Sequence, residues 1–327
     1  MGEHAYAHVP VMAGRVAALL LPALTGPVPG GRPPVLVDAT LGRAGHARAF
    51  LDAVPGLLLI GIDADTAAVE AGNALAERYP GRVTVAHAFY DRIAEIAAEA
   101  GHRRVQAVLF DLGVSSPQLD DTSRGFSYSQ DAPLDMRMDA GAELTAARIV
   151  NEYPVADLAR VLFEYGEEKF ARRIAETIAR ERAREPVTTT LRLSAIVKDA
   201  IPAPARRTGG NPAKRTFQAL RIEVNDELGA LRRALPAALD LLAPGGRLAA
   251  LAYHSLEDRL VKRELTARTA DRTPPGVPLR AGDAHPDAPR FRLLTRGAER
   301  PDPEELAANP RSASARLRAV ERLREAA

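Results

Sequence analysis

Short apolar runs alternate with helical patterns along the first third of the chain. Four of these runs have the unbroken apolar character of strands that are buried on both faces. They cover residues 35–38, 57–63, 83–86 and 105–112. Between them, apolar residues recur at helical spacing over segments long enough to cross back over a sheet. This alternation predicts an α/β protein with a doubly wound, Rossmann-like parallel sheet.

A long gap separates the fourth apolar run from the fifth, which covers residues 247–253. A crossover between parallel strands needs only about a dozen residues, so the gap predicts an insertion. Helical periodicity dominates this stretch. It indicates an all-helical subdomain over 135–205 and a discontinuous main domain over 1–134 and 206–327. We also expect one long helix over about 216–242, which returns the chain to the sheet.

The carboxyl ends of the first three predicted strands carry the residues expected of a nucleoside site. Gly42 and Gly45 follow the first strand, where the absence of a side chain lets the backbone approach a ligand. Asp63 ends the second strand, a position at which a carboxylate accepts hydrogen bonds from ribose hydroxyls. A helix cap is the other common role for such an acid, and Asp65 is available for it. Phe89, after the third strand, either walls an adenine or packs under the next helix.

Polar groups also follow the fourth and fifth predicted strands. The fourth strand ends in Asp111 and breaks into a loop that contains Ser115 and Ser116. His254 follows the fifth strand at the same edge of the sheet. All four side chains are candidate catalytic groups that orient a substrate or accept its proton. For His254, capping of the following helix is the alternative.

The composition excludes several kinds of catalytic and structural chemistry. The chain has no cysteine, which excludes disulfides, cysteine-bound iron–sulfur clusters and covalent cysteine catalysis. Its seven histidines show no metal-ligand spacing, so no metal site is expected. The apolar stretch 16–24 is shorter than a membrane span, and we expect a cytoplasmic protein with no membrane partner. The sequence leaves the oligomeric state open between monomer and homodimer.

A basic stretch leads back from the insertion to the main domain. It contains Arg206, Arg207, Lys214 and Arg215 around the flexible pair Gly209-Gly210. These cations either pair with the phosphates of a nucleic acid or belong to an ordinary solvated loop. The net charge of +2 permits an anionic partner without requiring one.

The predicted nucleoside site matches one cofactor better than the others. No phosphate-binding loop of the G-x-x-x-x-G-K-[ST] type occurs, and the first turn lacks the full dinucleotide motif. A nucleoside cofactor without pyrophosphate, beside acidic strand ends, suits S-adenosylmethionine with its cationic sulfonium. Methylation at carbon 5 of a pyrimidine usually needs a cysteine adduct, so an exocyclic amine or a hydroxyl is the expected acceptor.

Seven sequence blocks together resemble the bacterial RsmH (MraW) family. They are residues 38–46, 111–120, 124–127, 133–139, 165–171, 215–221 and 254–259, and the similarity continues to the terminal block 309–316. The resemblance implies methylation of the N4 amine of a cytidine in the decoding region of 16S ribosomal RNA. The partner would be that RNA or the small ribosomal subunit, held by the basic stretch and the helical insertion.

The resemblance also implies which residues contact the cofactor. They are Ala44, Gly45, His46, Asp63, Phe89, Asp111 and Gln118. The family usually has glycine where this chain has Ala44. A small-molecule methyltransferase with the insertion as a lid, and an RNA-binding factor without catalysis, are the competing functions.

Overall fold

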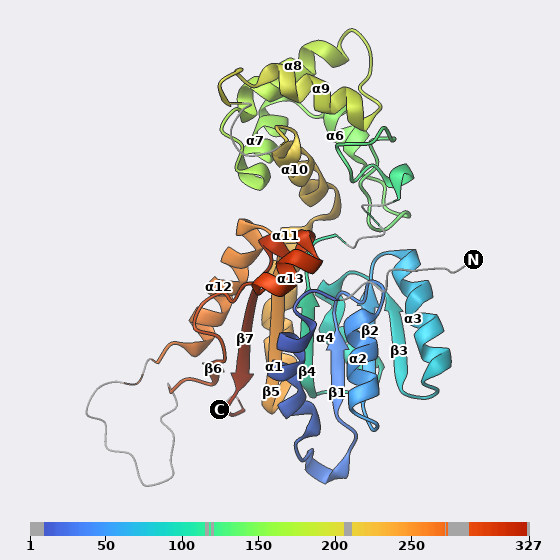
Figure 1. Ribbon diagram of the computed structural model, residues 1–327, viewed down its shortest axis with the longest axis vertical. Helices are drawn as coiled ribbons and strands as arrows, with labels where there is room; N and C mark the ends of the chain where they lie inside the picture. The colour runs from blue at the N-terminus through green and yellow to red at the C-terminus, as the bar shows by residue number, and fades with distance from the viewer. Residues whose placement is uncertain are drawn as a thin grey trace. The chain divides into compact units, whose positions relative to one another are not determined.

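The computed structural model describes residues 10–114, 118, 121–205, 211–271, 273 and 288–325 (Figure 1). The chain forms two compact units. The first comprises Met1–Gly113 and Ala230–Ala327, and the second comprises Val114–Gly229. The second unit is wider at both ends than the helical subdomain expected over 135–205. The loop before that subdomain and the helix after it contribute to its apolar core.

In the described part of the first unit, seven strands form one sheet in the order β3-β2-β1-β4-β5-β7-β6. The strands are β1 Val35–Asp38, β2 Leu58–Asp63, β3 Val83–His87, β4 Val105–Asp111, β5 Leu242–Ala252, β6 Phe291–Leu293 and β7 Arg316–Arg322. The first five strands are parallel, and β7 pairs antiparallel with both β5 and β6. The order changes direction between β1 and β4, which is where doubly wound sheets open a ligand crevice. The predicted α/β class is confirmed.

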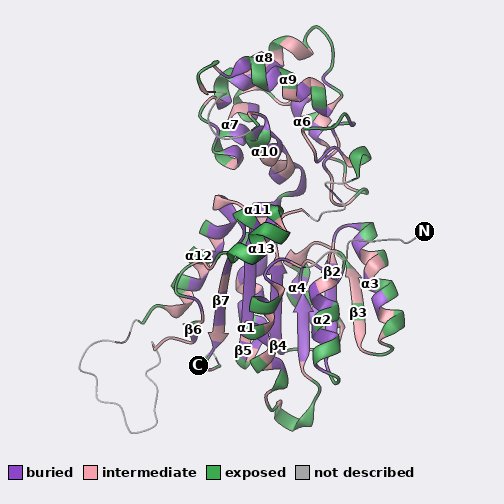
Figure 2. Cartoon of the chain, viewed as in Figure 1, coloured by how far each residue is buried: buried purple, intermediate pink, exposed green. Residues whose placement is uncertain are grey.

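Helices pack on both faces of this sheet (Figure 1). In β1, Val35 and Val37 face a core shared with α4 and α11, whereas Leu36 faces a core shared with α1 and α2. Both faces are therefore buried, as the purple strands of Figure 2 show. The helices of this unit are α1 Ala13–Thr25, α2 Gly45–Ala53, α3 Thr66–Arg78, α4 Ile93–Glu99, α12 Ser255–Thr269, α13 Pro303–Ala308 and most of α11 Glu227–Leu241.

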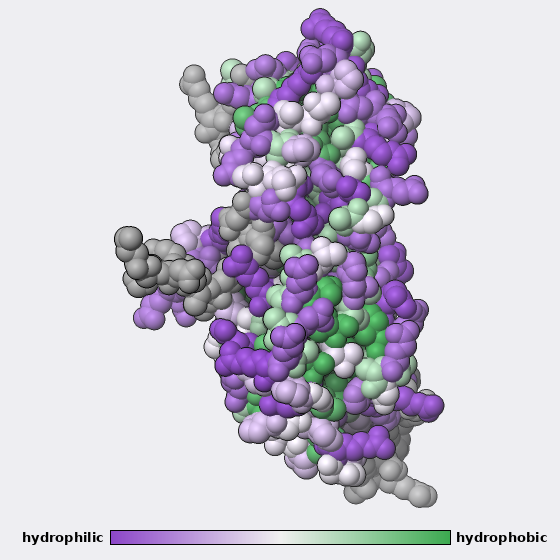
Figure 3. Space-filling view, turned by 90° about the vertical axis from the view of Figure 1, so that its right-hand side faces the viewer, coloured by the Kyte–Doolittle hydropathy of each residue, from purple (hydrophilic) through white to green (hydrophobic). Residues whose placement is uncertain are grey.

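The second unit is helical around its own apolar core. Its helices are α6 Ala146–Glu152, α7 Val155–Gly166, α8 Ala171–Arg182, α9 Thr190–Ala200 and α10 Lys214–Asn225. Helices α7 and α10 approach closely at Gly166, where an added Cβ would lie 2.8 Å from the Arg215 carbonyl oxygen. Hydrophilic side chains cover much of the face of this unit seen in Figure 3. No described helix is both long and apolar enough to span a membrane.

The prediction of a single long helix over 216–242 is wrong. The chain leaves α10 at Asp226, whose φ of 46° lies in the left-handed region, and starts again as α11 at Glu227. Leu220 and Val224 consequently pack in the core of the second unit rather than under the sheet. Only the later part of the expected helix, including Leu231, reaches the core of the first unit.

Candidate functional site

The loop between β1 and α2 is tied to the neighbouring strand by Asp63. One carboxylate oxygen of Asp63 accepts the Gly42 N–H at 2.8 Å, and the other accepts the Asp65 N–H at 2.9 Å. The Leu41 N–H donates to the Ile62 carbonyl at 3.0 Å and fixes the same corner. Burial raises the pKa of Asp63, while these backbone hydrogen bonds act to lower it. Because each carboxylate oxygen has a second lone pair, Asp63 can still accept from ribose hydroxyls.

Asp65 caps the next helix, as its position suggested. Its side chain accepts the Ala67 N–H at 3.0 Å at the start of α3. The two neighbouring acids therefore have separate roles. Asp65 serves the helix, whereas Asp63 faces the loop that leads from the first strand.

The two loop glycines differ in what surrounds them. At Gly42, with φ of 51°, an added Cβ would meet only the Thr40 carbonyl oxygen at 3.9 Å among the described atoms, so space for a ligand lies beside this backbone. At Gly45 an added Cβ would lie 2.7 Å from Cγ of Pro10. Glycine at position 45 therefore allows the loop to pack against Pro10, and the backbone at position 42 is open to a close approach.

Ala44 adopts a backbone conformation that glycine reaches without strain. Its φ of 57° and ψ of 26° are left-handed, and it forms the N-cap of α2 without a capping side chain. A left-handed alanine costs roughly 1–2 kcal/mol relative to the right-handed region. His46, in the first turn of the same helix, is buried, and its Nε2 lies 3.8 Å from Oδ2 of Asp111.

The structure separates the two aromatic residues that follow β3. Tyr90 packs edge-on against Phe110 of β4, with ring centroids 5.8 Å apart. Tyr90 therefore packs under the next helix, which was the alternative position predicted for Phe89. Phe89 is half-buried and, among the described residues, belongs to no apolar core cluster. This placement favours the interpretation of Phe89 as the wall of an adenine site.

Asp111, at the end of β4, is held in place by two neighbours. Its Oδ1 accepts a hydrogen bond from the Tyr253 hydroxyl at 2.7 Å, and its backbone N–H donates to Oγ1 of Thr40 at 2.6 Å. Burial, followed by the Asp111 charge and this hydrogen bond, raises the pKa of Tyr253. The phenol therefore remains a donor at neutral pH, and the Asp111 carboxylate keeps one orientation. Sequence reasoning did not find Thr40 or Tyr253, because a fold is needed to bring three strand ends together.

Asp38 is a further acidic group that sequence reasoning did not assign to the site. It ends β1, is 1% exposed, and accepts the Thr40 N–H at 3.3 Å. Burial raises its pKa from 3.8 to about 7, and the charges of Asp111 and Asp63 act in the same direction. The signal was present in the sequence, since Asp38 ends its apolar run just as Asp63 and Asp111 end theirs. Three carboxyl groups thus gather at the ends of adjacent strands and favour a cationic ligand.

His254 is a helix cap. Its Nδ1 accepts a hydrogen bond from the Glu257 backbone N–H at 3.4 Å. In return, the Glu257 side chain accepts hydrogen bonds from the backbone N–H groups of His254 and Tyr253. The other ring nitrogen, Nε2, lies 3.2 Å from Oε1 of Glu257. Both nitrogens therefore face this capping box at the start of α12.

Seven further residues were predicted for the cofactor, the catalytic group or the RNA, and the structure describes only three of them. Ser115, Ser116, Arg206 and Arg207 fall outside the described residues. Gln118 is buried and belongs to the second unit. Lys214 and Arg215 are exposed in the first turn of α10, where Nη1 of Arg215 donates to the Glu167 carbonyl at 3.0 Å.

The strand order defines a Rossmann-like sheet, and the match to a methylase family makes the chain a methyltransferase. The family model of the MraW methylase family matches residues 5–323, and the chain belongs to that family. It is 58% identical, over 99% of its length and 96% of the relative, to the Ribosomal RNA small subunit methyltransferase H of Thermobifida fusca. The protein of the same name from Frankia alni is 59% identical over 96% of this chain and 95% of its own.

Among solved structures, an rRNA methylase from Streptococcus thermophilus matches 89% of this chain and 87% of its own, with 12% identity and a TM-score of 0.38. The fold class follows from the strand order itself.

The residues present fit S-adenosylmethionine, the cofactor that the sequence predicts for a chain of this methylase family. The free space beside Gly42 admits a ligand close to the backbone, and Asp63 retains lone pairs for a ribose. Phe89 is left outside the described apolar cores, as the predicted wall of an adenine site requires. The acidic groups Asp38 and Asp111 suit the positive charges of the sulfonium and of the methionine ammonium group.

Two neighbouring substitutions should separate backbone strain from packing in this loop. We expect Ala44→Gly to leave the free energy of unfolding unchanged or to raise it by about 1 kcal/mol, because glycine adopts positive φ without strain. Gly45→Ala should lower it by about 1–3 kcal/mol, because the new methyl group meets Pro10. Denaturant unfolding of both variants measures the difference, and the reverse order of stabilities would contradict this account.

Proposed function

We propose that this chain methylates the N4 amine of a cytidine in the decoding region of 16S ribosomal RNA, in the cytoplasm, on the RNA itself or on the small subunit. The observation that carries the proposal is the identity of 58–59%, along nearly the full length, to proteins named Ribosomal RNA small subunit methyltransferase H. The absence of cysteine supports an amine over carbon 5 as the acceptor, because carbon-5 methylation usually proceeds through a cysteine adduct.

The chain's own residues would align the amine and the methyl group. Bound S-adenosylmethionine supplies an electrophilic methyl group on a sulfonium. Asp63 and Phe89 hold the nucleoside end, and the fixed carboxylate of Asp111 accepts an N–H of the target amine and points its nitrogen at the methyl carbon. The amine loses one proton as the new bond forms. Asp111 is the candidate group that takes this proton, and Ser115 and Ser116 are candidate hydrogen-bond acceptors that orient the amine.

His254 is a positioning residue in this proposal. Since its Nδ1 accepts the Glu257 N–H, the neutral ring carries its proton on Nε2, beside Glu257. The ring is then a poor general base for a substrate. Its contribution is to fix the start of α12 next to Tyr253, which in turn orients Asp111.

The second unit offers a basic surface for the RNA. Lys214 and Arg215 are exposed at the N-terminus of the 12-residue helix α10, where the helix dipole adds positive potential. Arg221, further along the same helix, is not part of this surface. It is mostly buried and forms a bidentate ion pair with Glu227 at 2.7 and 2.9 Å.

Removal of one of these cations should weaken RNA binding without affecting the cofactor. We expect Arg215→Ala to lower RNA affinity severalfold and to reduce the slope of log affinity against log salt by about one. The S-adenosylmethionine dissociation constant should stay unchanged. Arg173→Ala, which removes an exposed arginine from α8 of the same unit, is the matched control. Equal salt slopes for the two variants would remove Arg215 from the RNA surface.

The decisive experiment is methyl transfer with defined substrates. Labelled S-adenosylmethionine is incubated with the protein and with 16S RNA or small subunits that lack the modification, and the RNA is digested to nucleosides. The expected product is N4-methylcytidine at a single position. Label in carbon 5, label in a free metabolite, or RNA binding without any transfer would each overturn the proposal.

A further inference from the structure

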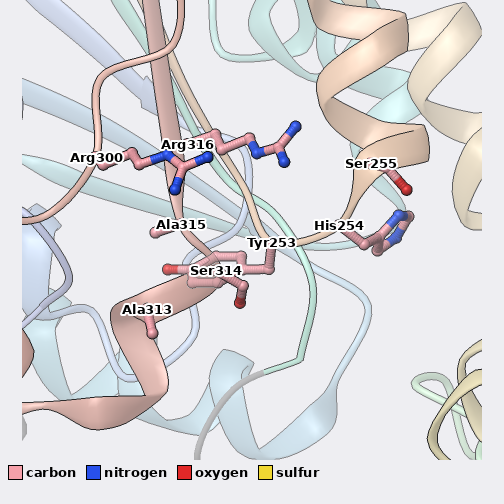
Figure 4. A pocket seen from close by; sticks show the side chains of 8 residues that line it. All are labelled: Tyr253, His254, Ser255, Arg300, Ala313, Ser314, Ala315 and Arg316. Carbon is pink, nitrogen blue, oxygen red and sulfur yellow. The ribbon is translucent and has the colours of Figure 1, made fainter. Parts of the chain in front are cut away.

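A polar cavity of about 240 Å³ lies beside the start of β7 in the first unit (Figure 4). It is lined by Tyr253, His254, Ser255, Arg300, Ala313, Ser314, Ala315 and Arg316. Two sequence blocks that the cofactor site does not use, 254–259 and 309–316, meet here. In the view of Figure 4 the guanidinium groups of Arg300 and Arg316 both lie above Ser314 and the Tyr253 ring.

Local backbone pairing brings the two arginines to the same cavity. Glu299 and Leu317 exchange two hydrogen bonds of 2.9 Å, each N–H donating to the other residue's carbonyl. Arg300 and Arg316 are the direct chain neighbours of this pair. Two cations on adjacent segments are therefore held together by the backbone, although like charges repel.

The charged side chains that line the cavity are two arginines, and its eight described lining residues include no carboxylate. The nearby Asp258 accepts from Arg318 at 2.7 and 3.2 Å and from Arg316 at 3.1 Å, so one carboxylate is shared by two guanidinium groups. Arg300 is exposed, and no carboxylate partner for its side chain is present among the described residues. The hydroxyl group of Ser314 adds a hydrogen-bond donor.

The position of the cavity relates it to the methyl acceptor rather than to the cofactor. Tyr253 lines the cavity and also donates to Asp111, so the two places share one side chain at the carboxyl edge of the sheet. The cofactor residues follow β1, β2, β3 and β4, whereas the cavity follows β5 and precedes β7. Strand β7 is three strands from β1, which amounts to roughly 14 Å at the usual strand spacing.

The size of the cavity limits its ligand. Pockets for whole small molecules usually measure roughly 300–1,000 Å³, and this one is smaller. Arginine forks and hydroxyl groups match the oxygens of a phosphate. We propose that the cavity binds a backbone phosphate of the RNA next to the target nucleotide, an inference that rests on the proposed function. That contact would place the target base beside Asp111.

The test uses the full-length protein and two variants of exposed cavity residues. Arg300→Ala removes a cation, and Ser314→Asp adds a negative charge. We expect each to raise the KM for RNA roughly three- to tenfold, and Arg300→Ala to lower the salt slope of RNA binding by about one. The dissociation constant of S-adenosylmethionine and the melting temperature should remain unchanged. Arg300→Lys, which keeps the charge, should recover part of the loss.

Arg296→Ala is the matched control, because Arg296 is an exposed arginine of the same unit that does not line the cavity. If wild type methylates RNA but Arg300→Ala behaves like Arg296→Ala, the phosphate site is wrong and the proposed function stands. If the variants weaken S-adenosylmethionine instead of RNA, the cavity holds the cofactor's carboxylate and the inference is also wrong. If wild type neither binds nor methylates ribosomal RNA, both proposals fall together.

Discussion

Replacing Asp38 with asparagine is expected to stabilise the protein without cofactor at pH 8 and, at the same time, to weaken the binding of S-adenosylmethionine. Asp38 is buried at the end of β1, and burial, assisted by the charges of Asp111 and Asp63, raises its pKa to about 7. Above that pH the folded protein must hold a buried carboxylate, which the amide avoids. The expected gain is on the order of 2–4 kcal/mol in the free energy of unfolding.

The sign of the pH dependence follows from the same shift. Between pH 4 and pH 7 the folded protein holds a proton on Asp38 that the unfolded chain has lost, because the ordinary pKa of an aspartate is 3.8. The wild-type contribution of this group to stability therefore falls as the pH rises through that window. Binding of a cation opposes this trend, since it favours the ionised form. S-adenosylmethionine should bind more tightly as the pH rises towards and past about 7.

Two ligands that differ in one charge show whether Asp38→Asn weakens cofactor binding through charge or through a change in the shape of the site. S-adenosylhomocysteine lacks the sulfonium charge, so Asp38→Asn should reduce the preference for S-adenosylmethionine over it, by roughly tenfold at pH 8. Glu70→Gln removes an exposed carboxylate from α3 of the same unit and serves as the control. An unchanged preference in Asp38→Asn, measured by calorimetry at pH 6 and pH 8, would show that this carboxyl group does not sense the cofactor's charge.

The parallel half of the sheet could be predicted because its signals are local. Each of the strands β1 to β4 is a short apolar run that stops at a polar residue or a turn, and each of the first three is followed by a helical pattern. The carboxyl ends of such strands share one edge, so Asp63 and Asp111 could be assigned to a common site before their positions were known.

The parts that were missed depend on contacts between distant segments. Residues 316–322 alternate between buried and partly buried positions, but their pairing with β5 and β6 is non-local and gives no signal in a short window. The break at Asp226 is invisible for the same reason. Apolar spacing continues across it, while the two halves of the expected helix pack in different cores.

In the candidate site, too, the features that could not be predicted depend on contacts between distant segments. The need for a small residue at position 45 arises from Pro10, which lies far away in the chain. The raised pKa of Asp38 arises from burial and from acids on two other strands. Neither follows from residue type or spacing. Packing against Pro10 is thus a further reason for glycine at position 45, and the contacts of Gly42 and Gly45 with the cofactor stay predictions.

Replacing Asp63 with alanine should cause the largest loss of cofactor binding among single changes in the loop region. The variant removes a ribose acceptor and also leaves the N–H groups of Gly42 and Asp65 without their acceptor. The expected cost is on the order of 1–3 kcal/mol, or about 5- to 150-fold in the dissociation constant of S-adenosylmethionine. Asp65→Ala is the control, because loss of its cap on α3 should lower stability by about 1 kcal/mol and leave cofactor affinity unchanged.

The variant Asp63→Asn tests whether cofactor binding needs both carboxylate oxygens of Asp63 as acceptors or only one of them. Both oxygens of Asp63 accept backbone N–H groups, so the amide would turn its NH₂ towards a donor whichever way it rotates. Asp63→Asn should therefore weaken the cofactor nearly as much as Asp63→Ala, although it is almost the same shape. If the asparagine variant binds S-adenosylmethionine like wild type while the alanine variant does not, the ribose contact needs only one oxygen, and the tie between Gly42 and β2 is dispensable for binding.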